Sequence, residues 1–450
     1  MRIGRSLSPL LLALLLPVTC VADLVGEHAF PQPPPAPGRL PNNVLIPNEA
    51  GASATFSEEG FVDRADNFHT PQGTNGRSCG TCHSAEAGWS LTPAQIRRRF
   101  IATGGLDPLF NKLDANNGTL DLSTVLKRKQ GYSLLLQGLF RRGGALREAR
   151  NFDIVAVDDP NGVGTTTTWS FYRRPLTTAN MKHIAGVLWD GRFNIADDGR
   201  PPRRGLFEQA AGNITGGQEA PKEPPPSPVL VNAIVDEELA IWHAQAAVPG
   251  VGRLDTCGGR GGPELLSLQP RVVGRFDLYD AWLGFVPNRC DHTRHGAARR
   301  AQIARGQEIF NTRPNKNPNG GTCQGCHNVA NNGTHFAGGF FNIGVSDEER
   351  RTPGLPLYTL RKRCDPNPEI PCTIEEKKTT DPGRAFNTGL FADVSAFKVP
   401  TLRGLAARAP YFHNGSAKTV REVVRHYSTV RNFQFTQQEE DDLVAFLNAL

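Results

Sequence analysis

Two short motifs of cysteine and histidine carry the clearest chemistry in this sequence. They read CGTCH at residues 79–83 and CQGCH at residues 323–327. Two thiols at this spacing can bond to the two vinyl groups of one porphyrin, and the adjacent histidine can supply the proximal ligand of its iron. We therefore expect two covalently bound haem c groups per chain. The predicted haem-binding residues are Cys79, Cys82, His83, Cys323, Cys326 and His327.

Redox-active disulfides or a shared zinc site are the other readings of these motifs. Both copies carry the histidine, and neither lies in a thioredoxin-like context, so haem attachment is favoured. Cysteines outside the motifs would form disulfides in an oxidising compartment. Cys257 could pair with Cys290 and Cys364 with Cys372, although connectivity does not follow from the sequence.

The N-terminal residues have the pattern of a secretory signal peptide. A basic start, an apolar core and a small-residue cleavage site follow one another: Arg2 with Arg5, residues 7–17, and residues 20–22. We therefore expect removal of residues 1–22 and export to the periplasm. A lipid anchor on Cys20 is the alternative. No later stretch reaches the length of uncharged apolar sequence that a membrane span requires.

Composition and charge exclude several classes of protein. The chain has 450 residues, of which 38% are hydrophobic, and this excludes a disordered or fibrous chain. Its net charge of +6 falls by two when Arg2 and Arg5 leave with the signal peptide. That balance is too mild to indicate a nucleic acid or an anionic membrane as partner. The 47 Gly and 35 Pro residues predict a loop-rich fold.

The wide separation of the motifs predicts a separate domain for each haem. A helix is predicted at Ala297–Phe310, and a capping box at residues 436–439 predicts another near the end of the chain. No alternating strand pattern of useful length occurs. We therefore expect a mainly α, loop-rich fold with two cytochrome c-like haem domains. The expected divisions are a signal peptide (1–22), a Pro-rich segment (23–45), a first, peroxidatic haem domain with the inter-haem segment (46–295) and a second, electron-transfer haem domain (296–450).

Further motifs resemble those of the bacterial di-haem cytochrome c peroxidases and their MauG-type relatives. Together they cover most of residues 75–450, with extra sequence between 90 and 170 and between 192 and 206. Their order and spacing are specific, whereas each one alone is weak. The motifs are WDGR at 189–192, Glu208-Gln209-Ala210 with Glu219, DPGR at 381–384, FKVPTLR at 397–403 and APYFHNG at 409–415.

The resemblance implies roles for two residues over the first haem and for one residue between the haems. Glu219 would act as acid and base, Gln209 would orient peroxide or water, and Trp189 would conduct electrons between the haems. A carboxyl buried beside a haem would have a raised pKa, which suits proton delivery near neutral pH. Residue type alone favours a surface loop for Glu219 and plain core packing for Trp189. The ten-residue spacing of Glu219 from Gln209 favours the interpretation of Glu219 as an active-site residue.

The first haem is expected to have an open sixth position. Arg99 stands where many family members carry the histidine that closes this site, and no histidine occurs between His83 and His183. This departs from the reductively activated peroxidases and resembles the constitutively open MauG-type enzymes. His69 or a more distant histidine is the alternative ligand.

The resemblance also implies an unusual ligand for the second iron. The family's ligand position falls on Tyr427, and MauG-type enzymes use a tyrosine there, which would stabilise the ferric state. Met181 is the only methionine left after Met1, and it lies before WDGR, where the family does not draw this ligand. His426 is the alternative, as is a Tyr427 that is packed without binding iron.

The family resemblance implies, in addition, a structural calcium. Backbone carbonyls at Arg408 and Pro410 would help to hold it. The position that matches the family's asparagine ligand is Arg174, where a cation could replace the metal.

Three functions follow from these expectations. The first is an exported di-haem peroxidase that reduces hydrogen peroxide with electrons passed from the second haem to the first and supplied by a small cytochrome c or cupredoxin. The second is a MauG-like oxidase or oxygenase that acts on a protein or organic substrate through high-valent haem. The third, an electron carrier without catalysis, is disfavoured by the missing histidine. We predict an oxidoreductase, monomeric or homodimeric.

Overall fold

The computed structural model describes residues 38–195, 203–284, 294–364 and 372–450. The predicted signal peptide, most of the Pro-rich segment and Cys290 lie outside these described residues. Within the described part, no helix is both long and apolar enough to cross a membrane.

The prediction of a mainly α fold is wrong. The structure is 32% helical and 19% strand, and its strands form several separate sheets. Strand β3 (Gly51–Ser57) consists mostly of Ala, Ser and Thr, whose weak contrast in polarity conceals its alternation. Strand β10 (Ile241–Val248) is buried along almost its whole length, so it shows no alternation. Both strands therefore lack the pattern by which a half-buried strand is recognised.

All pairings between the described strands are antiparallel. The largest sheets have the orders β11-β10-β3-β2 and β14-β13-β6, and the remaining pairs are β1-β4, β5-β7, β8-β9 and β12-β15. In the second sheet Tyr358 lies opposite both Val157 and Thr379, so segments far apart in the chain share one sheet. The other strand bounds are β1 Arg39–Pro41, β2 Ile46–Asn48, β4 Phe61–Asp63, β5 Phe140–Ala145, β6 Phe152–Asp158, β7 Thr168–Arg173, β8 Gly186–Val187, β9 Phe193–Ile195, β11 Gly252–Arg253, β12 Phe340–Asn342, β13 Leu357–Lys362, β14 Glu376–Thr379 and β15 Ala396–Lys398.

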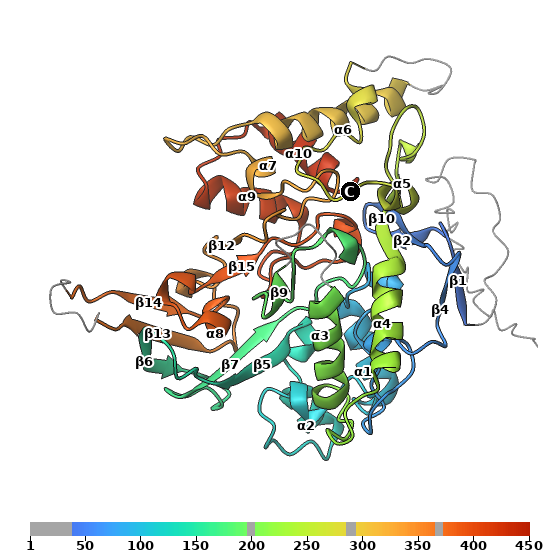
Figure 1. Ribbon diagram of the computed structural model, residues 1–450. Helices are drawn as coiled ribbons and strands as arrows, with labels where there is room; N and C mark the ends of the chain where they lie inside the picture. Colours follow the sequence, from blue (N-terminus) through green and yellow to red (C-terminus); the bar gives the residue numbers. More distant parts are fainter. Residues whose placement is uncertain (1–37, 196–202, 285–293, 365–371) are drawn as a thin grey trace, which may run out of the picture.

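The helices gather in two groups (Figure 1). Helices α6, α7, α9 and α10 lie at one end of the molecule, and α1 to α4 lie toward the other, with the β14-β13-β6 sheet projecting to one side. The helix bounds are α1 Pro93–Thr103, α2 Val125–Gly131, α3 Arg203–Gly216, α4 Pro228–Ala240, α5 Pro263–Ser267, α6 Arg294–Thr312, α7 Cys323–Cys326, α8 Ala385–Thr388, α9 Val420–Val430 and α10 Gln437–Leu447.

Both helices predicted from the sequence are present. Helix α6 contains the predicted segment, and α10 begins directly after Thr436, which forms the predicted capping box with Glu439. The two helices pack closely at Gly306, where a Cβ atom would lie 1.9 Å from the carbonyl oxygen of Asp442. Only glycine allows this approach.

Each motif has its own hydrophobic core. Around the second motif, the rings of Phe276, Phe310 and Phe446 meet at centroid distances of 5.3 to 5.6 Å, and Phe310 lies 5.9 Å from the ring of His327. One apolar cluster near the first motif includes Cys79, and a second, built from the extra sequence after residue 90, packs on Cys82. The cores therefore hold both motifs in fixed positions.

Candidate haem sites and the segment between them

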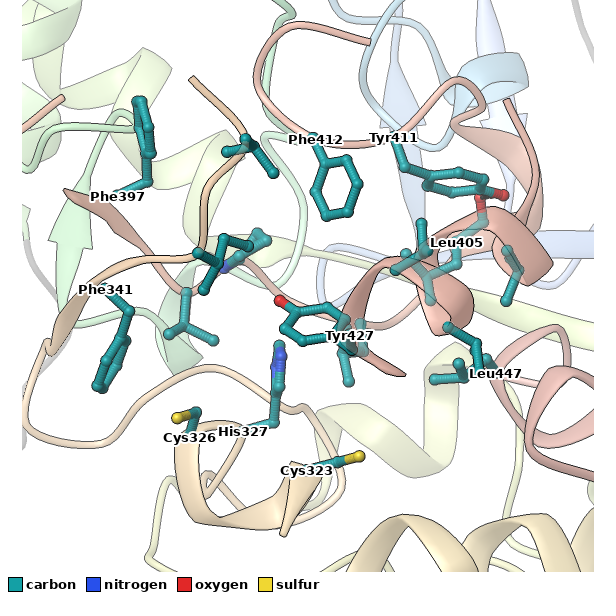
Figure 2. Close-up of a pocket in the computed structure, with 18 of the residues that line it drawn as sticks. Cys323, Cys326, His327, Phe341, Phe397, Leu405, Tyr411, Phe412, Tyr427 and Leu447 are labelled. Carbon is teal, nitrogen blue, oxygen red and sulfur yellow. Dashed lines mark hydrogen bonds between the residues drawn. The ribbon is translucent and has the colours of Figure 1, made fainter. Parts of the chain in front are cut away.

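The second motif lies on the floor of a cavity of about 370 Å³. Helix α7 carries both cysteines, and the hydroxyl of Thr322 caps it by accepting a hydrogen bond from the Gly325 amide at 3.2 Å. Figure 2 shows the rings of His327 and Tyr427 in this cavity, with Phe341 and Phe397 on one side and Leu405 and Leu447 on the other.

His327 has the tautomer and the protonation state that a metal ligand needs. Its Nδ1 atom donates to the carbonyl oxygen of Gly333 at 2.5 Å, which leaves Nε2 as the unprotonated nitrogen. Burial lowers the pKa of His327 to about 4, so its imidazole is neutral near pH 7. All four motif cysteines are free thiols. Free thiols, a neutral oriented histidine and apolar walls fit a covalently attached haem.

The first motif repeats this arrangement. His83 Nδ1 donates to the carbonyl oxygen of Trp89 at 3.0 Å, and burial lowers the pKa of His83. Arg99 donates to the carbonyl oxygen of Thr81 at 2.7 Å and is paired with Asp107. Arg99 therefore fixes the motif loop against α1.

The alternative ligand His69 lies beside the same loop. Its Nδ1 atom is 2.8 Å from Asp66 Oδ1. A Cβ atom on Gly80, inside the motif, would lie 2.8 Å from the imidazole of His69.

Glu219 and Gln209 are not joined by a hydrogen bond, although both belong to the described part. Glu219 is exposed, and its Oε2 accepts hydrogen bonds from Asn75 at 3.0 Å and Asn111 at 3.3 Å. Gln209 lies half-buried on α3. The structure thus places Glu219 against the segment that leads into the first motif, through Asn75, without the burial that the sequence suggested.

Gln218 is a buried neighbour that sequence reasoning missed. It is 1% exposed, its Oε1 accepts from the Gln72 amide at 2.9 Å, and its Nε2 lies 4.0 Å from Cys79 Sγ. Its position next to Glu219 was the only available signal.

Trp189 lines the cavity of the second motif. Its indole N–H donates to the carbonyl oxygen of Arg174 at 2.9 Å. The indole meets Phe397 and His413 edge-on at 6.5 and 6.2 Å, and those two rings stack at 4.0 Å. Trp189 is therefore held within an aromatic group on the cavity wall.

A buried ion network joins two of the family-like motifs. Arg173 contacts Asp190 of WDGR at 2.6 Å and Asp381 of DPGR at 2.7 Å. Burial opposes ionisation of Asp190, yet Arg173 and Arg192 lower its pKa to about 2. Both carboxylates are thus paired with an arginine inside the protein.

The three candidate ligands for the second iron lie in different places. Tyr427, on α9, lines the cavity, and burial raises the pKa of its phenol. His426 has Nε2 2.8 Å from the carbonyl oxygen of Ile343 and is absent from the described cavity lining. Met181 belongs to the core cluster that includes Cys79. Tyr427 is thus the candidate that shares a cavity with His327.

The side chain of Arg174 lies beside a carbonyl group that was expected to bind calcium. Its Nη2 atom donates to the carbonyl oxygen of Leu91 at 3.0 Å and approaches those of Arg408 at 3.3 Å and Ala409 at 3.5 Å. No group of three His, Cys, Asp or Glu side chains that could hold a metal ion occurs among the described residues. Pro410, the other expected ligand, follows a cis peptide bond and lines the cavity.

Two glutamates on α4 were also missed. Glu238 is 3% exposed, and its Oε2 atom has no hydrogen-bond partner in the described structure. Burial raises the pKa of Glu238, and that of Glu237, to about 8. Burial and the charge of Glu238 raise the pKa of Cys79. The run Asp236, Glu237 and Glu238 in an otherwise largely apolar segment was the available signal.

The disulfides agree in part with the sequence. Cys364 and Cys372 are bonded, as predicted. Cys257 is disulfide-bonded.

Comparison with known proteins identifies the family, although no family model matches the chain. The methylamine utilization protein MauG of Methylophilus methylotrophus is 35% identical over 289 residues, covering 62% of this chain and 68% of that protein. The cytochrome-c peroxidase IdrP2 of Denitromonas iodatirespirans is 30% identical over 293 residues, with the same coverages. The cytochrome c551 peroxidase of Nitrosomonas europaea is 41% identical over 76 residues, which are 17% of this chain and 23% of that protein. Together with the two haem-attachment motifs, these matches show that the chain is an oxidoreductase of the di-haem cytochrome c peroxidase and MauG family.

Proposed function

We propose that this protein is an exported di-haem peroxidase that reduces hydrogen peroxide at the first haem with electrons passed on from the second. One observation carries the proposal: Trp189 lines the cavity whose floor is the second haem motif. The peroxidase names of two relatives support hydrogen peroxide as the substrate. When bound, the haems supply redox-active iron that can cleave the peroxide bond and store electrons.

The residues of this chain hold and orient the reacting groups. His83 and His327 are the proximal ligands, and the carbonyl oxygens of Trp89 and Gly333 fix the orientation of their rings. Arg99 keeps the first motif in place without supplying a sixth ligand. A haem held by this motif would then keep a position open for peroxide.

Proton movement at the first haem is assigned to Glu219. Hydrogen bonds from Asn75 and Asn111 orient its carboxylate, which can take a proton from peroxide and return it to the leaving oxygen. Gln209 orients peroxide or water. Glu219 is exposed, so its carboxylate is in contact with solvent.

A second candidate function is a MauG-like oxidase or oxygenase that acts on a protein or organic substrate. The position of Tyr427 favours it, because Tyr427 and His327 line the same cavity and could both bind the iron of a haem held there. A phenolate ligand would lower the reduction potential of the second haem. A small cytochrome c or cupredoxin is the proposed electron donor of the peroxidase, and this MauG-like function would not need one.

Export, two haem domains and a monomeric or homodimeric state complete the proposal.

The decisive experiment is to express the full chain with haem-maturation machinery and to count haems by pyridine haemochrome. Peroxide consumption is then measured with a reduced small cytochrome c as the donor. Two haems per chain and donor-dependent turnover support the peroxidase. Two haems without turnover on any donor overturn peroxide reduction and favour the second candidate, and fewer than two haems overturn both.

A further inference from the structure

Four cationic residues line the second cavity: Arg174, Lys398, Arg408 and Arg431. Arg174 and Arg408 are the two of them whose charges interact with each other. Arg174 and Arg408 both line the cavity, and the side chain of Arg174 is 4% exposed. No carboxylate in the described part of the chain forms an ion pair with either residue, although Arg173, the neighbour of Arg174, pairs with Asp190 and Asp381. Arg173 is therefore paired with two carboxylates, whereas Arg174 is paired with none in the described part of the chain.

Backbone carbonyls supply the only hydrogen-bond acceptors that these guanidinium groups have in the described structure. Arg408 donates to the carbonyl oxygens of Arg403 at 2.7 Å and Thr401 at 3.0 Å. Arg174 donates to the carbonyl oxygen of Leu91 and approaches those of Arg408 and Ala409. Arg174 Nη1 is buried without any partner. Carbonyl dipoles satisfy part of the hydrogen-bonding need but do not neutralise a buried charge.

The two charges also repel each other. Burial and the charge of Arg408 lower the pKa of Arg174 to about 10, and burial lowers that of Arg408 to about 10. Both remain protonated near pH 7. Adjacent buried cations of one sign destabilise a fold unless an anion binds between or beside them.

We propose that Arg174 and Arg408 bind the propionate carboxylates of the haem in this cavity. The inference rests on the proposed attachment of a haem at Cys323 and Cys326. A haem carries two carboxylates on an otherwise apolar ring, and this cavity offers a largely apolar lining on which the guanidinium groups of Arg174 and Arg408 lie near each other. Arginine is well suited to the role because its planar fork matches a carboxylate.

Binding of this kind has a consequence for the iron. Guanidinium groups that neutralise the propionates remove negative charge from the neighbourhood of the second haem. The ferric state, which carries one more positive charge than the ferrous state, is then less stabilised. Arg174 and Arg408 therefore raise the reduction potential of the second haem.

The test uses the two-haem protein, labelled with 5-aminolevulinate that carries ¹³C at its carboxyl carbon, so that only the haem propionates are labelled. Redox difference infrared spectra then report the propionate carboxylates directly. Arg174→Met and Arg408→Met should shift the labelled bands and lower the potential of the second haem. Arg174→Lys, which keeps the charge, should retain most of the potential.

Arg403→Met is the matched control. Arg403 is 1% exposed and donates to the carbonyl oxygens of Asn331 and Gly262, but it is absent from the described lining of the cavity. Its variant should leave the labelled bands unchanged. If Arg174→Met does not fold, Arg408→Met and Arg174→Lys carry the test.

Unchanged bands in Arg408→Met and in every folded Arg174 variant would overturn the inference while the haem count of two remains intact. Bands that respond to added acetate or chloride would also overturn it, because the guanidinium groups would then bind a soluble anion. Failure of the haem attachment itself would show as a haemochrome value below two in the unmutated protein.

Discussion

The indole N–H of Trp189 donates to the carbonyl oxygen of Arg174, and the two residues lie on the same cavity wall. A carbonyl oxygen accepts this hydrogen bond but is not basic enough to remove the proton. An indole that loses an electron would therefore keep its N–H proton and could be re-reduced without waiting for a proton to return. This suits a residue that relays electrons.

Replacing Trp189 by phenylalanine should slow electron transfer between the haems at least tenfold and leave the haem content unchanged. Rapid-mixing spectroscopy of the half-reduced protein with peroxide measures that step. Trp282→Phe is a matched control, because the Trp282 indole also donates to a backbone carbonyl, that of Cys257 at 3.0 Å, but belongs to the core. Equal rates in the two variants would remove Trp189 from the electron path.

Tyr427→Phe should change the low-spin EPR signal and the redox titration of the second haem, because the proposed oxygen ligand is lost. Covalent haem content should stay at two per chain. Tyr411→Phe is the control: Tyr411 lines the same cavity, and its phenol donates to the carbonyl oxygen of Leu405 at 3.2 Å. An unchanged spectrum in Tyr427→Phe would exclude this ligand and weaken the MauG-like reading.

Peroxide should react directly with the all-ferric protein. The reason is that Arg99 stands where many family members carry the closing histidine, and its contacts with Thr81 and Asp107 agree with the proposed open position on the first iron. EPR of the protein as isolated should show at least one high-spin or water-bound ferric haem. A reaction that begins only after half-reduction would mean that another ligand, with His69 the first candidate, closes the site.

Glu238→Gln should make the protein more stable above pH 8 and should have little effect below pH 4.5. Burial raises the folded-state pKa of Glu238 from 4.5 to about 8. The folded state therefore retains a proton that the unfolded chain releases, and this contribution to stability is complete below pH 4.5 and lost as pH rises to about 8. Each unit by which the folded-state pKa exceeds the unfolded-state pKa corresponds to about 1.4 kcal/mol in the free energy of unfolding.

Denaturant unfolding across this pH range measures the effect. Asp236→Asn, on the same helix, is the control, since Asp236 forms an exposed ion pair with Arg203. A gain in Glu238→Gln that does not depend on pH would contradict an ionisable buried carboxyl.

Removing divalent metals with a chelator should leave the melting temperature and the EPR spectrum unchanged. Arg174 already provides a positive charge at the carbonyl oxygen of Arg408, where calcium was expected. A lower melting temperature that added calcium restores would show that a metal binds here in spite of the arginine.

Local patterns made part of this structure predictable. The capping box at Thr436 and the apolar spacing after it depend only on neighbouring residues, and so do the two haem motifs. The bridge between Cys364 and Cys372 was one of the pairings that the sequence allowed, and it is present. These features could be predicted because the contacts that create them join residues that are close together in the sequence.

Long-range burial accounts for what could not be predicted. Which of the adjacent residues His426 and Tyr427 faces the cavity depends on how α9 is turned against the rest of the fold. Glu238 is buried only because α4 packs on the core cluster that includes Cys79. Strand β10 is recognisable only from its partners, because both of its faces are covered.

If Trp189 relays electrons as proposed, the contacts of Arg173 with Asp190, the neighbour of Trp189, and with Asp381 would help to hold the relay in place. Electron tunnelling weakens exponentially with distance, so any widening of the gap beside Trp189 would slow it sharply. Opening the network would leave buried carboxylates unpaired, at a cost on the order of 3–5 kcal/mol. Fewer than about one molecule in a hundred would then be open at any moment. The tunnelling distance is thus expected to stay nearly constant as temperature changes.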